Sequence, residues 1–390
     1  MKTLAVIGAS FLQRPLVEKA QEMGVRTICF AWEDGAVCRD ICDVFYPISI
    51  IEKEKILQIC RQEMIDGICT IASDVAAPTV AYVADKMGLV GNNYDAAVRA
   101  NNKYMMRQAF MAAGIRCPKF ICVTKDSINN ARFLLNNLEL PLIIKPTDRS
   151  GSLAVTKINE WCQLPSALKS ALDVSFCNEA IVEEFVDGRE ISVEFISYRG
   201  KHYPLQITDK VTTEAPHFVE LEHHQPAALS SAMYGRIYNI TECALDALGL
   251  TNGASHSEYK ITKDGRIFVM EIGGRMGGDF IGSDLVQLST GYDFVRGVIE
   301  VALDMFCDSS LNTSGSLSNV QQHSGVYFLC KETEYLMPIF KHWKDYKEII
   351  VCKQDDKELR NVVCSGDRNG YFIYQGAEKF VVRNASSNSL

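Results

Sequence analysis

The 390-residue sequence lacks any segment that stays apolar for the roughly 18 residues that a transmembrane helix needs. Its opening stretch, MKTLAVIGAS, contains an apolar run that is too short for a secretory signal. An internal repeat of the kind that builds solenoid proteins is also missing. We therefore expect a cytoplasmic protein that neither crosses nor binds a membrane.

Excess positive charge is absent too, since the formal net charge is −8. This balance argues against a nucleic-acid partner and against an anionic membrane surface. The fourteen cysteines form no Cys-x-x-Cys pair, and most of them, such as Cys69 and Cys364, lie in apolar runs. We expect them to be small buried hydrophobic residues. A Ser-His-Asp or Cys-His arrangement that would supply a nucleophile is not found.

The first 90 residues alternate short apolar strands with amphipathic helices. Strands are expected at 4–7, 26–30, 44–48 and 67–71, and helices at 13–23, 52–63 and 77–87. This rhythm predicts a parallel sheet that is covered on both faces. Ligands of such sheets lie beyond the carboxyl ends of the strands, which is where Gly8, Ser10, Ser73 and Asp74 fall.

The rest of the chain mixes strands and helices less regularly. Strands are expected at 142–145, 180–185 and 191–196, and helices at 101–113, 230–248 and 292–305. Residues 307–322 are rich in Ser and Asn and are predicted to be a linker. Strands near 325–329, 349–352 and 371–374 predict a small β-rich C-terminal module. The fold class is therefore α/β and α+β, with several domains.

Residues 257–272 are predicted to form a β-hairpin that turns at Asp264-Gly265. If that turn has two residues, Glu258 lies directly opposite Glu271, with Cβ atoms about 5 Å apart. The other face would then be apolar, formed by Tyr259, Ile261, Phe268 and Met270. A hard divalent cation such as Mg²⁺ would make the repelling pair acceptable. The alternative is a solvent-facing pair that Lys260 partly neutralises.

The segment that follows the hairpin favours a phosphate site. Four glycines between positions 273 and 278 leave the backbone open to a ligand, and Arg275 offers a bidentate fork for phosphate or carboxylate. Lys145 ends an apolar strand and precedes the loop 148–152, whose N–H groups are suited to bind phosphates. The stretch 181–190 predicts a strand, a bend and a second strand, which is typical either of an adenine-binding connection or of an ordinary hairpin.

These motifs, in this order, resemble the ATP-grasp superfamily. The matching pieces are NNKYMMR, PLIIKPTDRSGS, VEEFVDGREISVEF and HSEYKIT followed by IFVMEIGGRMGG. The resemblance is nearest to carboxylate–amine ligases related to biotin carboxylase, carbamoyl phosphate synthase and bacterial L-amino-acid ligases. It implies a preATP-grasp Rossmann-like domain over 1–95 and an ATP-grasp domain over 96–306. The latter would have a smaller nucleotide lobe at about 115–185 and a larger lobe at about 186–306, followed by the linker 307–322 and the module 323–390.

The resemblance also implies a nucleotide site. Lys103 and Lys145 would contact the ATP phosphates, and Lys145 would also lie near the adenine. Glu183 would accept a hydrogen bond from the adenine amino group, and the backbone of Val186 would pair with the ring. Glu190 would bind the ribose.

The same comparison implies the metal and catalytic groups. Glu258 and Glu271 would bind Mg²⁺ or Mn²⁺, with Glu271 bridging two ions. Arg275 would stabilise the transition state of an acyl phosphate, and Lys210 would add a phosphate contact. Many relatives carry Asn where this chain has Gly273, which leaves the number of metal ions open.

The expected activity is an ATP-dependent ligase that activates a small-molecule carboxylate as an acyl phosphate and joins it to an amine. Relatives of this type are often dimers, so the resemblance implies a homodimer and the oligomeric state stays open. One alternative is an NAD-dependent oxidoreductase, suggested by the strand, Gly8 and helix at the start, although the second and third glycines of that fingerprint are missing. The other is a catalytically silent ATP-binding regulator.

Histidines gather before the long helix, at His217, His223 and His224, with Glu220 between them. A zinc cluster would need partners that this spacing does not supply. We instead predict a loop over 212–226 that closes over the substrate.

Overall fold

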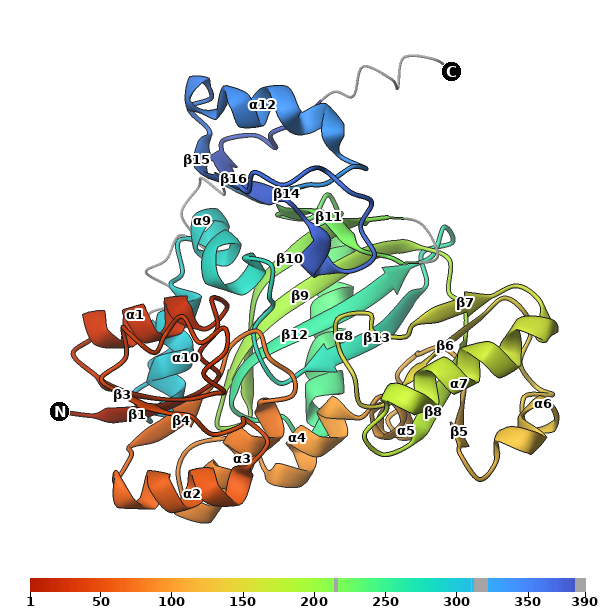
Figure 1. The fold of residues 1–390 in the computed structure, drawn as a ribbon, viewed down its shortest axis with the longest axis horizontal. Coiled ribbons are helices and arrows are strands. Elements are labelled where there is room, and N and C mark those ends of the chain that lie inside the picture. Colours follow the sequence, from red (N-terminus) through yellow and green to blue (C-terminus); the bar gives the residue numbers. More distant parts are fainter. Residues whose placement is uncertain (214–216, 310, 312–321, 383–390) are drawn as a thin grey trace.

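The computed structural model describes residues 1–213, 217–309, 311 and 322–382. Within these residues, one parallel and two antiparallel sheets form the frame. Figure 1 shows the N-terminal part in red and orange, a small yellow lobe on the opposite side and the blue C-terminal part above a long central sheet. The mixed α/β and α+β multidomain fold expected from the sequence is confirmed.

The N-terminal part is a four-stranded parallel sheet with the strand order β3-β2-β1-β4. Its elements are β1 (Thr3–Ile7), α1 (Arg14–Glu22), β2 (Arg26–Phe30), β3 (Val44–Tyr46), α2 (Lys53–Gln62), β4 (Gly67–Cys69), α3 (Ala77–Met87) and α4 (Tyr94–Asn101). Strand β1 is buried along its whole length, as expected of a parallel strand covered on both faces. The loops after β1 and β4 carry Ser10 and Asp74, as predicted.

A helix from much later in the chain covers one face of this sheet. Val6 of β1 shares a core with Val298 of α10 (Phe294–Ala302), whereas α2 and α3 pack on the opposite face. The approach is close because Gly67 has no side chain, and a Cβ atom there would lie 2.4 Å from the carbonyl oxygen of Ala302. The first 95 residues therefore do not close their own core.

The small lobe is an antiparallel sheet with the order β5-β8-β6-β7. Helix α5 (Lys103–Ala112) leads into β5 (Phe120–Thr124), α6 (Ala131–Leu134), β6 (Leu142–Pro146), β7 (Thr156–Ile158), α7 (Leu164–Val174) and β8 (Glu179–Glu184). Leu142 and Ile144 pack in the core beside α7. Because side chains alternate along a strand, Ile143 and Lys145 face the other way, into a cleft.

The large lobe is built on an eight-stranded antiparallel sheet with the order β13-β12-β9-β10-β11-β14-β16-β15. Its elements are β9 (Arg189–Tyr198), β10 (Lys201–Thr212), β11 (Glu220–Gln225), α8 (Ser231–Leu248), β12 (Gly253–Ile261), β13 (Ile267–Gly273), α9 (Val286–Thr290) and α10. Ser230 caps α8 by accepting from the N–H of Met233, and Gly249 ends it at a φ of 76°. Because Ile237 of α8 packs with Tyr259 of β12, the opposite face of the sheet is left to line the cleft.

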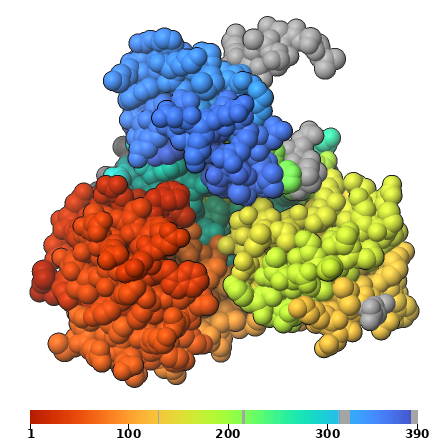
Figure 2. Space-filling view, in the orientation of Figure 1, coloured from red at the N-terminus to blue at the C-terminus, as the bar shows by residue number. Residues whose placement is uncertain are grey.

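The C-terminal strands extend this same sheet. They are β14 (His323–Leu329), β15 (Ile349–Gln354) and β16 (Gly370–Gly376), with α12 (Met337–Lys341) between the first two. Strand β14 pairs with β11, which continues the sheet into the C-terminal part. Figure 2 shows the red, yellow and blue parts around a central recess, with the atoms of the large lobe behind it.

Two local expectations are wrong. Residues 220–225 form β11 rather than a loop, because the partners of this polar strand lie elsewhere in the chain. Only five of the fourteen cysteines are buried, Cys69 among them, and Cys364 is exposed. Strands β8 and β9 belong to different sheets, so of the two alternatives for 181–190 the connection between lobes is present and the hairpin is not. Most of the predicted linker 307–322 lies outside the described residues. None of the helices within the described ranges is long and apolar enough to cross a bilayer.

Candidate functional site

A cleft with about 400 Å³ of free volume lies between the small lobe and the large sheet, which is within the range of small-molecule sites. Every site residue predicted from the sequence lines it: Lys103, Lys145, Glu183, Val186, Glu190, Lys210, Glu258, Glu271 and Arg275. The fold therefore brings together residues that lie up to 172 positions apart, from 103 to 275.

The two candidate metal carboxylates face each other on β12 and β13, as predicted. Glu258 is paired with Glu271 in the register of the hairpin. The predicted two-residue turn is wrong, however, because the N–H of Thr262 bonds to the carbonyl of Arg266 and leaves three residues in the turn. A bulge beside Glu258 restores the register.

The bulge also changes which side chains pack in the core. Tyr259 is paired with Val269 and Ile261 with Ile267, and these residues belong to one hydrophobic cluster. The prediction that Phe268 and Met270 share that face is wrong. Met270 lines the cleft instead.

Glu258 is held by two cationic groups. Its Oε1 lies 2.6 Å from Nζ of Lys210 and 3.4 Å from Nε2 of His256. Burial would raise the pKa of Glu258, but Lys210 and His256 together hold it well below its usual range. Burial would likewise lower the pKa of Lys210, which the carboxylates of Glu258, Glu220 and Glu190 raise. Lys260, which we considered as a neutralising partner, instead pairs with Glu190 at 3.0 Å.

Glu271 has a different lysine partner. Nζ of Lys103 lies 2.9 Å from Oε1 of Glu271 and 2.7 Å from the carbonyl oxygen of Arg149. Lys103 is positioned at the start of α5, where the side chain of Asn102 caps the helix by accepting from Met105. One ammonium group thus ties the hairpin to the loop 148–152.

Glu183 lies between two cations at the back of the cleft. Its Oε1 accepts from Nε of Arg107 at 2.6 Å, and its Oε2 lies 2.7 Å from Nζ of Lys145. Burial would raise the pKa of Glu183, but Arg107 and Lys145 lower it to about 2. Arg107 was not predicted. The signal for it is its spacing of four from Lys103 on one helix, which places both on the same face.

Arg275 is held by a residue of the N-terminal part. Asp74 accepts from Nε and Nη2 of Arg275 at 2.7 and 2.6 Å. A Cβ atom at Gly273 would lie 2.6 Å from Oδ1 of Asp74. Asp74 therefore occupies the space into which a side chain at position 273 would project, which gives a physical reason for glycine at this position.

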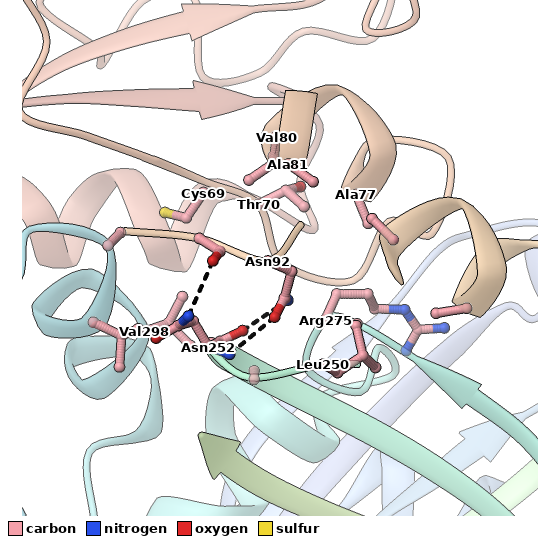
Figure 3. A pocket seen from close by; sticks show the side chains of 18 of the residues that line it. Cys69, Thr70, Ala77, Val80, Ala81, Asn92, Leu250, Asn252, Arg275 and Val298 are labelled. Atoms are coloured by element: carbon pink, nitrogen blue, oxygen red, sulfur yellow. Dashed lines mark hydrogen bonds between the residues drawn. The ribbon is translucent and has the colours of Figure 1, made fainter. Parts of the chain in front are cut away.

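Hydrogen bonds fix the N-terminal part beside Arg275. Figure 3 shows Asn92 and Asn252 joined across the boundary between β12 and the segment before α4. Nδ2 of Asn92 donates to the carbonyl of Asn252 at 2.8 Å, and Nδ2 of Asn252 donates to the carbonyl of Gly91 at 3.0 Å. The position of Asp74 relative to Arg275 is thereby defined.

His256 completes the inner wall. Its Nδ1 contacts Glu194, whose second oxygen accepts from the N–H of Gly277 at 2.9 Å. Burial would lower the pKa of His256, but Glu194 and Glu258 raise it to about 9. Glu194 was not predicted, because nothing in the sequence links it to a histidine 62 positions away.

The carboxylates fit a magnesium site better than a zinc site. In the described part of the chain, no group of three or more His, Cys, Asp or Glu side chains is placed to hold a metal ion. Mg²⁺ is commonly bound by one or two carboxylates together with substrate phosphates. Glu258 and Glu271 supply two such groups on one wall of the cleft, close to cations that suit phosphates.

The start of the chain does not favour a dinucleotide. The side chain of Gln13 fills the turn after β1, where its Oε1 accepts from the N–H of Ser10 at 3.1 Å. Its Nε2 donates to the carbonyl of Ile71 at 2.7 Å. A Cβ atom at Gly8 would lie 2.9 Å from this side chain. The N–H group of Ser10 is therefore already occupied, and Gln13 fills the space beside Gly8 that a pyrophosphate would need.

Residues 138–284 match the model of the ATP-grasp domain, a span that contains eight of the nine predicted site residues, all except Lys103. The chain therefore contains an ATP-grasp domain. The L-amino acid ligase from Bacillus licheniformis has a similar structure, with a TM-score of 0.79 and 23% identity over 97% of this chain and 94% of that one.

Two of the proteins with similar sequences are named as ligases. Alanine–anticapsin ligase of Bacillus subtilis is 30% identical over 250 residues, which cover 58% of this chain and 51% of that protein. D-alanine–D-alanine ligase of Flavobacterium johnsoniae is 29% identical over 153 residues, covering 38% of this chain and 46% of that protein. The chain spans about half the length of these curated relatives.

Proposed function

We propose that the protein is an ATP-dependent ligase that activates a carboxylate as an acyl phosphate and joins it to an amine, with release of ADP and phosphate. The observation that supports this most is the facing pair Glu258 and Glu271, set among lysines in a cleft of the ATP-grasp domain. Both relatives are named as ligases of alanine or D-alanine, so we propose amino acids as substrates. The cytoplasm is the location we expect for this chemistry.

ATP would lie along the cleft with its base at the connection between the lobes. In this proposal the backbone of Val186 pairs with the adenine and Glu190 holds the ribose. Glu183 is buried between Arg107 and Lys145. It lies on the adenine side of the site and keeps Lys145 directed at the phosphates. Each of these groups lines the cleft.

Lysines that now neutralise carboxylates would bind phosphates during turnover. Lys103 and Lys210 contact Glu271 and Glu258, the residues that would hold Mg²⁺ or Mn²⁺. A bound ion supplies charge neutralisation at the phosphates and their alignment. Lys103 and Lys210 would then be free to pair with the phosphate oxygens, whose negative charge would replace that of the carboxylates.

The reaction needs positioning more than a side-chain nucleophile. A carboxylate oxygen of the substrate attacks the γ-phosphorus, the bond to the β-phosphate oxygen breaks, and ADP leaves. The amine nitrogen then attacks the acyl carbon, the carbon–oxygen bond to phosphate breaks, and the departing phosphate takes up the proton that the nitrogen loses. Arg275, aligned by Asp74, would stabilise the negative charge that develops at the acyl oxygen.

The test is ADP release in a screen of all pairs of the twenty protein amino acids with Mg-ATP, and mass spectrometry of the product. We expect ADP release that depends on the pair, and a product with the mass of both substrates less one water. Glu271→Gln should lower turnover by roughly 100-fold or more, whereas Glu22→Gln on the exposed face of α1 should not. ATP binding without ADP release for any pair would indicate a silent regulator, and binding of NADH with indifference to ATP would indicate an oxidoreductase.

A further inference from the structure

Three residues from separate elements meet where the C-terminal part closes the cleft. Asp279 follows the glycine-rich loop, His223 lies on β11, and Arg368 precedes β16. Asp279 and His223 line the cleft together with Ser365 of the C-terminal part. None of these residues has a part in the nucleotide site proposed above.

Arg368 holds the carboxylate of Asp279 in one orientation. Its Nη1 and Nη2 donate to Oδ2 and Oδ1 at 2.8 and 2.7 Å. Its Nε donates to the carbonyl of Ser365 at 2.8 Å, and the guanidinium lies 3.7 Å from the centre of the Phe328 ring. Because most of its donors are used within the protein, Arg368 braces Asp279 rather than binding a ligand itself.

Asp279 still has acceptor capacity toward the cleft. Its side chain is 25% exposed, and an ionised carboxylate can accept about four hydrogen bonds. The backbone of Asp279 and of Phe280 has positive φ, at 49° and 68°. Such conformations are costly for residues other than glycine and concentrate at functional sites. They direct Asp279 back toward Arg368 instead of along a regular helix.

His223 is a buried polar group without a hydrogen bond. It is 1% exposed, and neither ring nitrogen has a hydrogen-bond partner among the described residues. Its Nε2 lies 3.6 Å from Oδ2 of Asp279, which is beyond hydrogen-bonding distance. Two unsatisfied nitrogens on a buried histidine need an explanation, and a ligand in the cleft would supply their missing partner.

The register of the sheet places His223 next to the reaction centre. It is the cross-strand partner of Lys210, so both side chains lie on the same face about 5 Å apart. Lys210 in turn contacts Glu258. A ligand held by His223 and Asp279 would thus lie one side chain away from the candidate metal carboxylate.

We propose that Asp279 and His223 form the subsite for the amine substrate and bind a primary amine, such as the α-amino group of an amino acid. This inference rests on the proposed function and names the residues that its second substrate would meet. In its neutral, nucleophilic form the nitrogen of a primary amine has two N–H donors and one lone pair. It would donate one N–H to the Asp279 carboxylate and the other to a ring nitrogen of His223, which directs the lone pair at the acyl carbon. The carboxylate of Asp279 would disfavour a negatively charged group at this position, and Glu220 lines the same cleft.

A trapping experiment with hydroxylamine distinguishes binding of the amine substrate from activation of the carboxylate. At high concentration this small nucleophile traps an acyl phosphate as a hydroxamate without a dedicated binding site. Asp279→Asn should raise the KM for an amino-acid acceptor by about tenfold or more, the effect of one lost charge-assisted hydrogen bond. Hydroxamate formation from each of the twenty protein amino acids with Mg-ATP should stay within about twofold of wild type. Asp345→Asn, at an exposed position in the C-terminal part, is the matched control. It should change neither the acceptor KM nor the rate of hydroxamate formation.

His223→Gln provides an independent variant for the case that Asp279→Asn does not fold. It leaves the ion pair between Asp279 and Arg368 intact. It should also raise the acceptor KM and spare hydroxamate formation. An unchanged acceptor KM in a variant that forms hydroxamate normally would overturn the subsite, and so would an equal loss of both activities. If the wild type forms no hydroxamate from any amino acid, the proposed function itself fails and the subsite with it.

Discussion

At the scale of single residues, the cleft is organised by pairs of opposite charges. Lys103 holds Glu271, Lys210 holds Glu258, and Asp74 holds Arg275. Such pairs balance charge in a partly buried site and keep the cations directed at one point. In the proposed function, the same cations become available to the phosphates when a metal ion binds the carboxylates.

Glu183 should make stability depend on acid pH. Its pKa is about 2 in the folded protein against an ordinary value of 4.5, so its contribution is complete above pH 4.5 and is lost as the pH falls toward 2. Between pH 7 and pH 3 this corresponds to about 2 kcal/mol of unfolding free energy. Urea denaturation at both pH values should show that Glu183→Gln loses less stability than wild type over this interval. Equal losses would contradict the buried pairing.

The pairs differ in how far the sequence could predict them. Glu258 and Glu271 were placed opposite each other by hairpin symmetry, which is a local rule. The partners Arg107 and Glu183 lie 76 positions apart, and Asp74 and Arg275 lie 201 apart. No local pattern encodes such contacts, because they arise only once the lobes and the N-terminal part pack together.

At the scale of elements, the pairing of Glu258 with Glu271 in the hairpin β12–β13 was predicted correctly although the predicted turn was wrong. The turn has three residues rather than two, which alone would have moved Glu258 out of register, and the bulge beside it restores the pairing. The apolar face was mispredicted for the same reason. Strand β11 was missed because ELEHHQ lacks the apolar alternation that marks a half-buried strand.

The connection between the lobes depends on close contact at Gly188. A Cβ atom there would lie 2.6 Å from the carbonyl oxygen of Ile261, and that backbone cannot move without disturbing β12. Gly188→Ala should therefore lower the free energy of unfolding by about 2 kcal/mol, measured by urea denaturation. Gly235→Ala on α8, where no atom lies within 4 Å, is the control and should be neutral or stabilise by up to about 1 kcal/mol. Equal effects at both positions would contradict the close contact.

At the scale of the whole molecule, the cleft is assembled from parts that do not close their own cores. Helix α10 covers the N-terminal sheet, and β14 continues the large sheet into the C-terminal part. The alternation of strands and helices predicted the N-terminal sheet correctly. It could not predict that a helix almost 300 positions from the start would complete it.

The N-terminal part should act on catalysis through Asp74. Asp74→Ala leaves Arg275 without its carboxylate partner, so kcat should fall by roughly tenfold or more while the KM for ATP changes little. Asp74→Asn keeps one acceptor oxygen and should recover part of the rate. Asp85→Ala, exposed on α3 of the same part, is the control. A rise in KM with unchanged kcat would show that Asp74 does not position Arg275.

The central claim is that Glu258 and Glu271 together hold the metal ion that accompanies ATP. Crystals grown with Mn²⁺ and a nonhydrolysable ATP analogue would test it through an anomalous difference map. The account predicts a peak about 2.1 Å from carboxylate oxygens of both residues, with Lys103 and Lys210 turned toward the phosphates. A peak elsewhere in the cleft, with both carboxylates still bound to their lysines, would contradict it.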